Sequence, residues 1–210
     1  MKAGTIKVLY NPIFDLSLIL KAQAPVDHPW LQSGQPPIFL AVGRLAPQKD
    51  FSTLIKAFAI FRQKHLARLI ILGEGSERQQ LESEVSQLNL EADVSLPGFT
   101  DNPYAYMSRA SAFVLSSRFE ALPTVVIEAL ACGCQIIATD CPHGPNEILM
   151  AGKYGLLVPV GDAQSFADAM EKAISNPINP NFLRQRAYDF TVKNAALEYL
   201  KAMNLDYLLE

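Results

Sequence analysis

Charged residues with the spacing of a phosphate-binding loop occur in the first quarter of the sequence. Gly43 and Arg44 are followed five residues later by Lys49, directly before an apolar helical pattern that begins at Phe51. Two cations beside a helix N-terminus suit a phosphorylated ligand, because the N-terminal end of a helix also favours negative charge. A solvated loop with ordinary surface charges is the alternative interpretation.

A second stretch places a carboxylate in a segment that is otherwise apolar. Pro123 suits the first turn of a helix and Gly133 its C-terminal end, with Thr124 and Glu128 as the polar residues between them. Burying a carboxylate is costly unless another group pairs with it. Glu128 is therefore either half of a buried ion pair or an acceptor for ligand hydroxyls. Glu120 lies eight residues earlier, so both acids could face one cleft at different depths.

A third loop, Gly73-Glu74-Gly75, resembles part of a dinucleotide-binding fingerprint. The third glycine of that fingerprint would fall at Arg78, and the acid at Glu74 would repel a pyrophosphate. Nicotinamide dinucleotides are therefore disfavoured. We interpret the two glycines as points of close backbone approach or as turns of the chain.

A cluster of cysteines raises the question of a metal site. Three cysteines lie within ten positions, at Cys132, Cys134 and Cys141. Their spacing lacks the C-x2-C pairs of zinc sites, and an odd number argues against a disulfide framework. We interpret them as reduced, partly buried thiols and expect no metal. His28 and His65 have no evident partners.

Short apolar runs alternate with segments of helical period along most of the chain. The runs predict buried strands at 6–10, 38–42, 69–72, 94–96, 113–116, 135–139 and 156–160. Helices are predicted from Phe51, after an N-cap at Ser76, and at 103–110, 123–131, 145–151 and 163–174. This alternation predicts an α/β fold with a doubly wound, Rossmann-like parallel sheet. Its strand-to-helix loops, which carry the residues above, converge where ligands bind in such sheets.

Composition excludes several classes of protein. Half of the 210 residues are hydrophobic, so the chain can form a core. Eighteen basic and 21 acidic residues give a net charge of −3, which leaves no cationic surplus for a nucleic acid. No apolar run approaches the ~20 residues that span a bilayer, and no export signal is evident. We expect a cytoplasmic protein without a nucleic-acid partner or a transmembrane segment.

Taken together, the motifs resemble the nucleotide-sugar-binding half of a glycosyltransferase of family 4 (group 1), which is retaining and has the GT-B fold. The resemblance covers about residues 38–175 in the order and spacing of the family. The matching elements are Gly43-Arg44-Leu45 with Lys49-Asp50, Gly73-Glu74-Gly75, Leu96-Pro97-Gly98-Phe99, Glu120 with Glu128, Gly133, 136–140 and 155–159.

The resemblance implies roles for individual residues. Arg44 and Lys49 would bind the donor diphosphate and Glu120 the hydroxyls of the donor sugar, so these three are the implied catalytic residues. Glu128 would bind the ribose diol. The other implied donor-binding residues are Gly43, Gly73, Gly75, Phe99, Thr100, Ala121, Leu122, Pro123 and Thr124, with the turn at 98–100 beside the base.

Two cations and a helix N-terminus could offset the charge on the departing nucleotide, so no metal or other cofactor is implied. Many members of the family carry glycine where this sequence has Ala121. If that position requires a positive φ, an alanine there would be strained.

The family has two Rossmann-like domains, and this sequence resembles one of them. We predict an interdomain strand and irregular linker at residues 1–37, a donor-binding domain at 38–178 and a C-terminal helical extension at 179–210. The extension would either leave an apolar surface exposed or fold onto its own domain.

The expected function is donor binding in the transfer of a sugar from a UDP- or GDP-sugar to a glycan or glycolipid. We expect little or no transfer by this chain alone, because the acceptor-binding half is missing from it. The chain would be a fragment or would work with a separate partner chain, and any membrane contact would be peripheral, through that other half. A nucleotide-sugar epimerase and a stand-alone, non-catalytic nucleotide-binding module are the alternatives.

Overall fold

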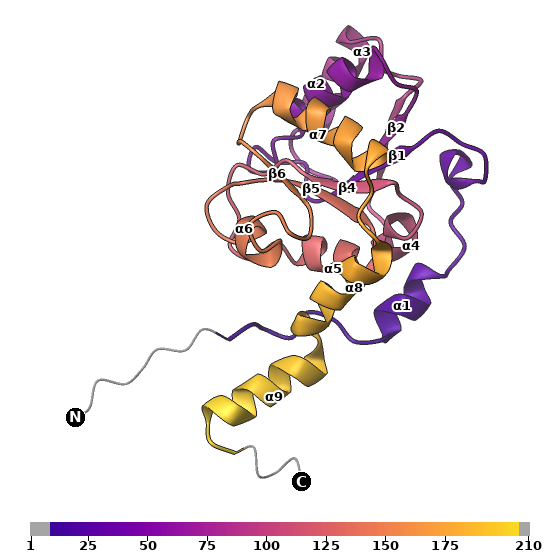
Figure 1. Ribbon diagram of the computed structural model, residues 1–210. Helices are drawn as coiled ribbons and strands as arrows, with labels where there is room; N and C mark the ends of the chain where they lie inside the picture. The colour runs from indigo at the N-terminus through magenta and orange to yellow at the C-terminus, as the bar shows by residue number, and fades with distance from the viewer. Residues whose placement is uncertain (1–8, 206–210) are drawn as a thin grey trace.

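The computed structural model describes residues 9–205 and contains a parallel sheet between two layers of helices (Figure 1). The sheet has six strands in the order β3-β2-β1-β4-β5-β6, and all neighbouring strands are parallel. The strands are Ile38–Val42 (β1), Arg68–Leu72 (β2), Val94–Gly98 (β3), Ala112–Leu115 (β4), Gln135–Thr139 (β5) and Leu156–Val158 (β6). The predicted fold class is confirmed.

Helices cover both faces of the sheet. They are Ser17–Ala22 (α1), Phe51–Arg62 (α2), Arg78–Gln87 (α3), Pro103–Met107 (α4), Thr124–Cys132 (α5), Pro145–Ile148 (α6), Ala163–Ser175 (α7), Pro180–Ala187 (α8) and Val192–Ala202 (α9). Single 3-10 turns occur at Pro29–Leu31 (η1) and Tyr188–Phe190 (η2). Helices α2, α3 and α7 pack on one face, and α1, α4, α5 and α8 on the other. None of the helices in this part of the chain has the length and apolar character needed to cross a membrane.

The strands are apolar on both sides because each contributes to two cores. In β1, Leu40 faces the core beneath α4 and α5, whereas Phe39 faces the opposite core. Phe39 meets the rings of Phe58 and Phe61 edge to face, with centroids 6.4 and 5.2 Å away. A strand buried on both faces has no polar alternation, which is why these runs could be recognised in the sequence.

The order of the strands determines where a ligand can bind. β1 pairs with β2 on one side and with β4 on the other, so the chain direction across the sheet reverses between β1 and β4. The loops that follow these two strands leave toward opposite faces of the sheet and open a crevice between them. The loops after β1 and β4 carry most of the residues that the sequence singled out.

Two local predictions differ from the structure. Residues 12–37, predicted as irregular, include η1 and the short helix α1, whose Leu18 and Ala22 are buried against α4. Ser76 is not an N-cap, because α3 begins at Arg78. The Glu77 amide donates to the carbonyl of Leu45, 3.0 Å away, and so holds the preceding turn against the loop after β1. The run at 6–10 lies largely outside the described residues, and Leu9 and Tyr10 are not in a strand.

The C-terminal helical pattern is divided into three pieces that behave differently. Helix α8 folds onto α5, with Leu183 and Ala187 buried, and η2 adds the buried ring of Phe190. Helix α9 extends away from the sheet (Figure 1) and leaves Tyr199 and Met203 exposed. Helix α8 therefore follows the alternative in which the extension folds onto its own domain. Helix α9 follows the alternative in which it leaves an apolar surface exposed.

Candidate functional site

The loops after β1 and β4 are tied together at the point where the strand order reverses. The Arg118 amide donates to the carbonyl of Gln48 at 2.8 Å, and the Gln48 side chain donates to the carbonyl of Phe119 at 2.9 Å. The Ser116 hydroxyl donates to the carbonyl of Lys49 at 2.6 Å. These contacts fix the two loops relative to each other without any ligand.

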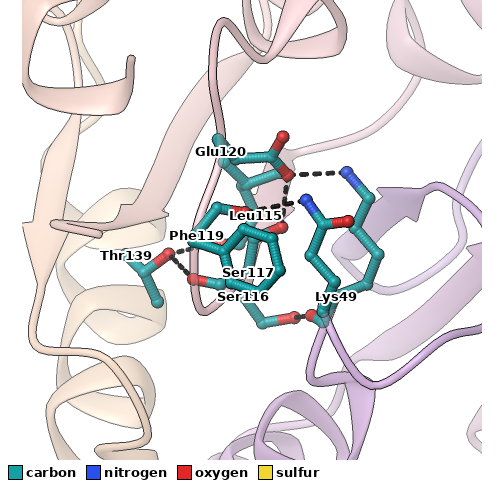
Figure 2. Close-up of polar contacts among 8 residues, drawn as sticks. Lys49, Leu115, Ser116, Ser117, Phe119, Glu120 and Thr139 are labelled. Carbon is teal, nitrogen blue, oxygen red and sulfur yellow. Dashed lines mark hydrogen bonds and ion pairs between the residues drawn. The ribbon is translucent and has the colours of Figure 1, made fainter. Parts of the chain in front are cut away.

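Lys49 and Glu120, which lie 71 residues apart, meet in an ion pair between these loops (Figure 2). The Lys49 Nζ lies 2.6 Å from Glu120 Oε1, and the two side chains are 19% and 9% exposed. The Ser117 hydroxyl donates to the same oxygen, also at 2.6 Å. A phosphate that entered here would compete with the Glu120 carboxylate for the ammonium of Lys49.

Arg44 lies beside a cavity rather than in an ion pair. The cavity has a volume of about 420 Å³ and is lined by Val42, Gly43, Arg44, Leu72, Gly73, Glu74, Phe99, Thr100 and Pro103. Arg44 is exposed, and no acidic side chain among residues 9–205 lies within ion-pair distance of its guanidinium. The structure thus brings an unpaired cation to a cavity that Phe99, itself 75% exposed, also lines.

The two glycines of the third loop allow the loops after β1, β2 and β3 to approach closely. A Cβ on Gly73 would lie 1.9 Å from the Gly43 carbonyl oxygen, and one on Gly75 would lie 2.2 Å from that of Leu45. The Gly73 amide donates to the carbonyl of Gly98 at 2.8 Å. The interpretation of these glycines as points of close backbone approach is confirmed.

Glu128 lies on the second turn of α5, among apolar neighbours. Burial raises the pKa of its carboxyl. Burial, followed by the charge of Glu128, also raises the pKa of Tyr104 on α4. In the part of the chain that the structure describes, Glu128 receives no hydrogen bond and forms no ion pair, so the ion-pair alternative is not observed there. Glu128 does not line the cavity beside Arg44.

The segment from Ala121 to Thr124 forms the N-terminal entry of α5. Ala121 is not among the described residues with a positive φ, so an alanine is unstrained at this position. No side chain in the described region caps the helix at Pro123. The first amides of a helix have no partners within it, so those of α5 can bind an acceptor from outside. Leu122 is half-buried, and Thr124 is exposed.

Sequence reasoning missed several residues that shape the site. Thr139, at the end of β5, donates its hydroxyl to the Ser117 carbonyl at 2.6 Å. Gly144 packs against the entry of α5, where a Cβ would lie 2.4 Å from the Cδ of Pro123. The loop after β5 therefore closes on the loop after β4. The adjacent serines and the strand-end threonine were visible in the sequence, but no local spacing indicated these contacts.

Cys132, Cys134 and His28 lie outside this arrangement, whereas Cys141 lies near Thr139 and Glu120. All three cysteines are buried and none of them forms a disulfide bond. Burial raises the pKa of the Cys132 thiol to about 12. Cys132 and Cys134 have backbone carbonyls as their neighbours, at 3.7 and 3.6 Å. The sequence indicated no partner for His28, but the structure buries its side chain against two. Its Nε2 lies 3.4 Å from the Ser95 hydroxyl, and its ring packs on Trp30.

The fold and the crevice define a Rossmann-like domain of the kind that forms one half of a GT-B protein. A family model described as glycosyl transferases group 1 matches residues 27–190. The chain belongs to this family of glycosyltransferases. The apo form of the lipopolysaccharide outer core galactosyltransferase WaaB superimposes with a TM-score of 0.73 at 25% identity, covering 82% of this chain and 50% of that one.

Two further similarities concern a curated relative and a solved structure. The N-acetylgalactosamine-N,N'-diacetylbacillosaminyl-diphospho-undecaprenol 4-alpha-N-acetylgalactosaminyltransferase of Campylobacter jejuni is 37% identical in an alignment of 171 residues that covers 77% of this chain and 46% of the relative. HepE of Anabaena, solved in complex with UDP, shares the fold with a TM-score of 0.70 at 22% identity, over 80% of this chain and 48% of its own. The chain thus spans about half the length of the curated relatives it matches.

Proposed function

We propose that this chain is the donor-binding domain of a retaining, metal-independent glycosyltransferase that passes a sugar from a UDP- or GDP-sugar to a glycan or glycolipid. The observation that carries the proposal is the meeting of Lys49, Glu120 and the entry of α5 beside the cavity that Arg44 lines. Family membership and the UDP bound by the structural neighbour support a nucleotide-sugar donor.

The donor diphosphate would lie between Arg44 and Lys49. Arg44 is unpaired among the described residues, and Lys49 is held by a carboxylate that a diphosphate could displace. Both cations, with the uncapped amides of α5, would stabilise the negative charge that grows on the departing nucleotide. This arrangement supplies the stabilisation that a metal ion provides in other sites, and we therefore include metal independence in the proposal.

The two carboxylates would bind hydroxyl groups of the donor, Glu120 those of the sugar and Glu128 the ribose diol. A carboxylate is a pure acceptor with two oxygens, which suits a pair of neighbouring hydroxyls. Glu128 is the stronger candidate for ligand binding, because a half-buried carboxylate without a hydrogen-bond donor is costly in the free protein. Phe99 and Thr100 would lie beside the base, where the exposed ring of Phe99 offers a stacking surface.

Titration calorimetry with UDP, GDP and ADP tests the proposal. We expect the wild type to bind at least one of the three, and Arg44→Ala and Glu128→Ala to weaken that binding about tenfold or more, since each removes a charged or hydrogen-bonding contact. Lys64→Ala and Glu84→Ala serve as controls, because they remove the same charges from the turn after α2 and from α3, outside the cavity lining. A wild type that binds no nucleotide would falsify the proposal.

We expect transfer itself to require the whole protein, and the span of this chain, about half the length of its relatives, supports that expectation. Incubating the whole protein with the nucleotide sugar that binds, followed by product analysis, distinguishes a new glycosidic bond from an epimerised donor. Binding by this chain without either product would favour a non-catalytic module. The acceptor, and any peripheral contact with a cytoplasmic membrane face, would belong to the other half of the protein.

A further inference from the structure

Three hydroxyl side chains are buried directly behind the Lys49–Glu120 pair. Ser116, Ser117 and Thr139 are at most 1% exposed. Serine and threonine are mostly found at protein surfaces, and when buried they are hydrogen-bonded. All three lie at the carboxyl ends of β4 and β5, and each donates its hydroxyl to an atom of the two site loops.

Two of these hydroxyls form a chain of contacts that ends on Glu120 (Figure 2). Thr139 donates to the Ser117 carbonyl at 2.6 Å, and the Ser117 hydroxyl donates to Glu120 Oε1 at 2.6 Å. The pairing of Leu115 with Ala138 places Thr139 of β5 beside the residues that directly follow β4. A side chain of β5 thus fixes the backbone that carries Ser117, and Ser117 in turn holds the carboxylate.

We propose that Ser117 is a positioning residue that orients Glu120 toward the donor sugar, with Thr139 as its anchor. This inference rests on the proposed function, in which Glu120 binds the sugar hydroxyls. Oε1 receives both donors, Ser117 and Lys49. The second oxygen receives no hydrogen bond from the residues the structure describes, and Figure 2 shows it pointing away from both donors.

Ser117 is the donor that can remain when a ligand is bound. The Lys49 side chain is flexible and can turn toward a diphosphate, whereas Ser117 is held by the backbone and by Thr139. A hydroxyl that donates to a carboxylate forms a short, strong bond, and 2.6 Å is in that range. The carboxylate would therefore keep its orientation, with its second oxygen still pointing away from Ser117, after Lys49 has left.

Comparing a nucleotide with its sugar conjugate tests this inference. The dissociation constants of UDP and UDP-glucose, and of GDP and GDP-mannose, are measured by calorimetry, and the pair that the wild type binds is then used. We expect Ser117→Ala to weaken the nucleotide sugar about tenfold and the bare nucleotide less than about twofold, because the lost contact acts only on Glu120. Thr139→Val keeps the side-chain shape and should give a smaller loss with the same selectivity.

Two further variants separate the possible failures. Ser111→Ala, at the opposite end of β4, removes a hydroxyl that accepts from the Ile38 amide at 3.1 Å, and it should lower stability without changing either dissociation constant. Glu120→Gln should weaken the nucleotide sugar selectively. The inference is overturned, and the proposed function stands, if Glu120→Gln weakens the nucleotide sugar more than the bare nucleotide while Ser117→Ala and Thr139→Val weaken both equally or neither. If Glu120→Gln is not selective, or the wild type binds neither pair, the proposed role of Glu120 fails and the inference fails with it.

Discussion

The two carboxylates of the site are in opposite electrostatic situations. Glu120 has two donors on one oxygen, Lys49 and Ser117, and is held between loops. Glu128 is half-buried beside Tyr104 and Cys132 and receives no hydrogen bond within residues 9–205. The charge on Glu120 is therefore stabilised in the free protein, whereas the charge on Glu128 lowers the stability of the fold.

This difference predicts a pH-dependent stability that depends on Glu128. Burial raises the pKa of Glu128 in the folded state above its ordinary value of 4.5, so the folded protein binds more protons than the unfolded chain between these two values. The free energy of unfolding contributed by Glu128 therefore falls as pH rises through that window. We expect Glu128→Gln to be more stable than the wild type at pH 7, by about 1 kcal/mol, and the difference to vanish near pH 4.

Urea unfolding of both proteins at several values between pH 4 and 7 measures this effect. Glu84→Gln, on the helix α3, is the control for replacing a carboxyl with an amide elsewhere in the fold. An equal offset between wild type and Glu128→Gln at every pH would contradict the assignment of the effect to ionisation.

At the scale of the elements, the site depends on how closely the loops after the strands approach one another. The backbone at Gly73 lies against the Gly43 carbonyl and is bound to the carbonyl of Gly98. One glycine thus connects the loops after β1, β2 and β3 beside the cavity that Arg44 lines. A side chain at that position would separate the loops that carry the proposed diphosphate and base contacts.

We therefore expect Gly73→Ala to destabilise the protein far more than an alanine at another left-handed glycine. Its Cβ would lie 1.9 Å from a backbone oxygen, and its φ is +141°. Gly161→Ala is the matched control, since Gly161 has φ +76° with nothing within 4 Å of the added Cβ. Chemical unfolding should give a loss of about 3 kcal/mol or more for Gly73→Ala and about 1 kcal/mol for Gly161→Ala. Similar losses would show that backbone conformation, rather than close approach, limits both positions.

Most elements were predictable because their signals are local. The apolar runs at β1, β2 and β5, and the helical stripe that begins at Phe51, each reflect burial within one segment. The predicted start of α3 was wrong by one residue, because the preceding turn is bonded to Leu45, which is distant in the sequence. The single pattern after residue 180 could not indicate that α8 packs on α5 while α9 extends away.

Across the whole molecule, the C-terminal segment divides into a part that belongs to the core and a part that does not. Helix α8 contributes Leu183 and Ala187 to the core beneath α5, and Arg186 donates to the carbonyl of Ile148 at 2.8 Å. Helix α9 buries Ala195 among its described residues. Half of the length of the curated relatives has no counterpart in this chain.

We expect a chain that ends at Thr191 to keep its fold and its nucleotide affinity. Removing α9 takes away few buried side chains, so the loss of stability should stay near 1 kcal/mol and the dissociation constant for the nucleotide should change less than about twofold. A chain that ends at Ser175 is the comparison, and it should fail to fold stably because it lacks Leu183, Ala187 and Phe190. Thermal melts followed by circular dichroism measure the stability of both chains, and calorimetry measures their nucleotide affinity. If the chain that ends at Thr191 is unfolded, α9 is needed to stabilise the domain.

The sequence by itself determined the alternation of strands and helices and the loops that carry Arg44, Lys49, Glu120 and Glu128, because burial periodicity and loop residues are properties of single segments. Only the tertiary structure decided that Lys49 and Glu120 meet at 2.6 Å, that Ser117 and Thr139 are buried behind them, and that no described residue pairs with Glu128. These contacts depend on β4 lying between β1 and β5. Which strands become neighbours is a property of the folded sheet, and it brings together residues that no spacing along the chain connects.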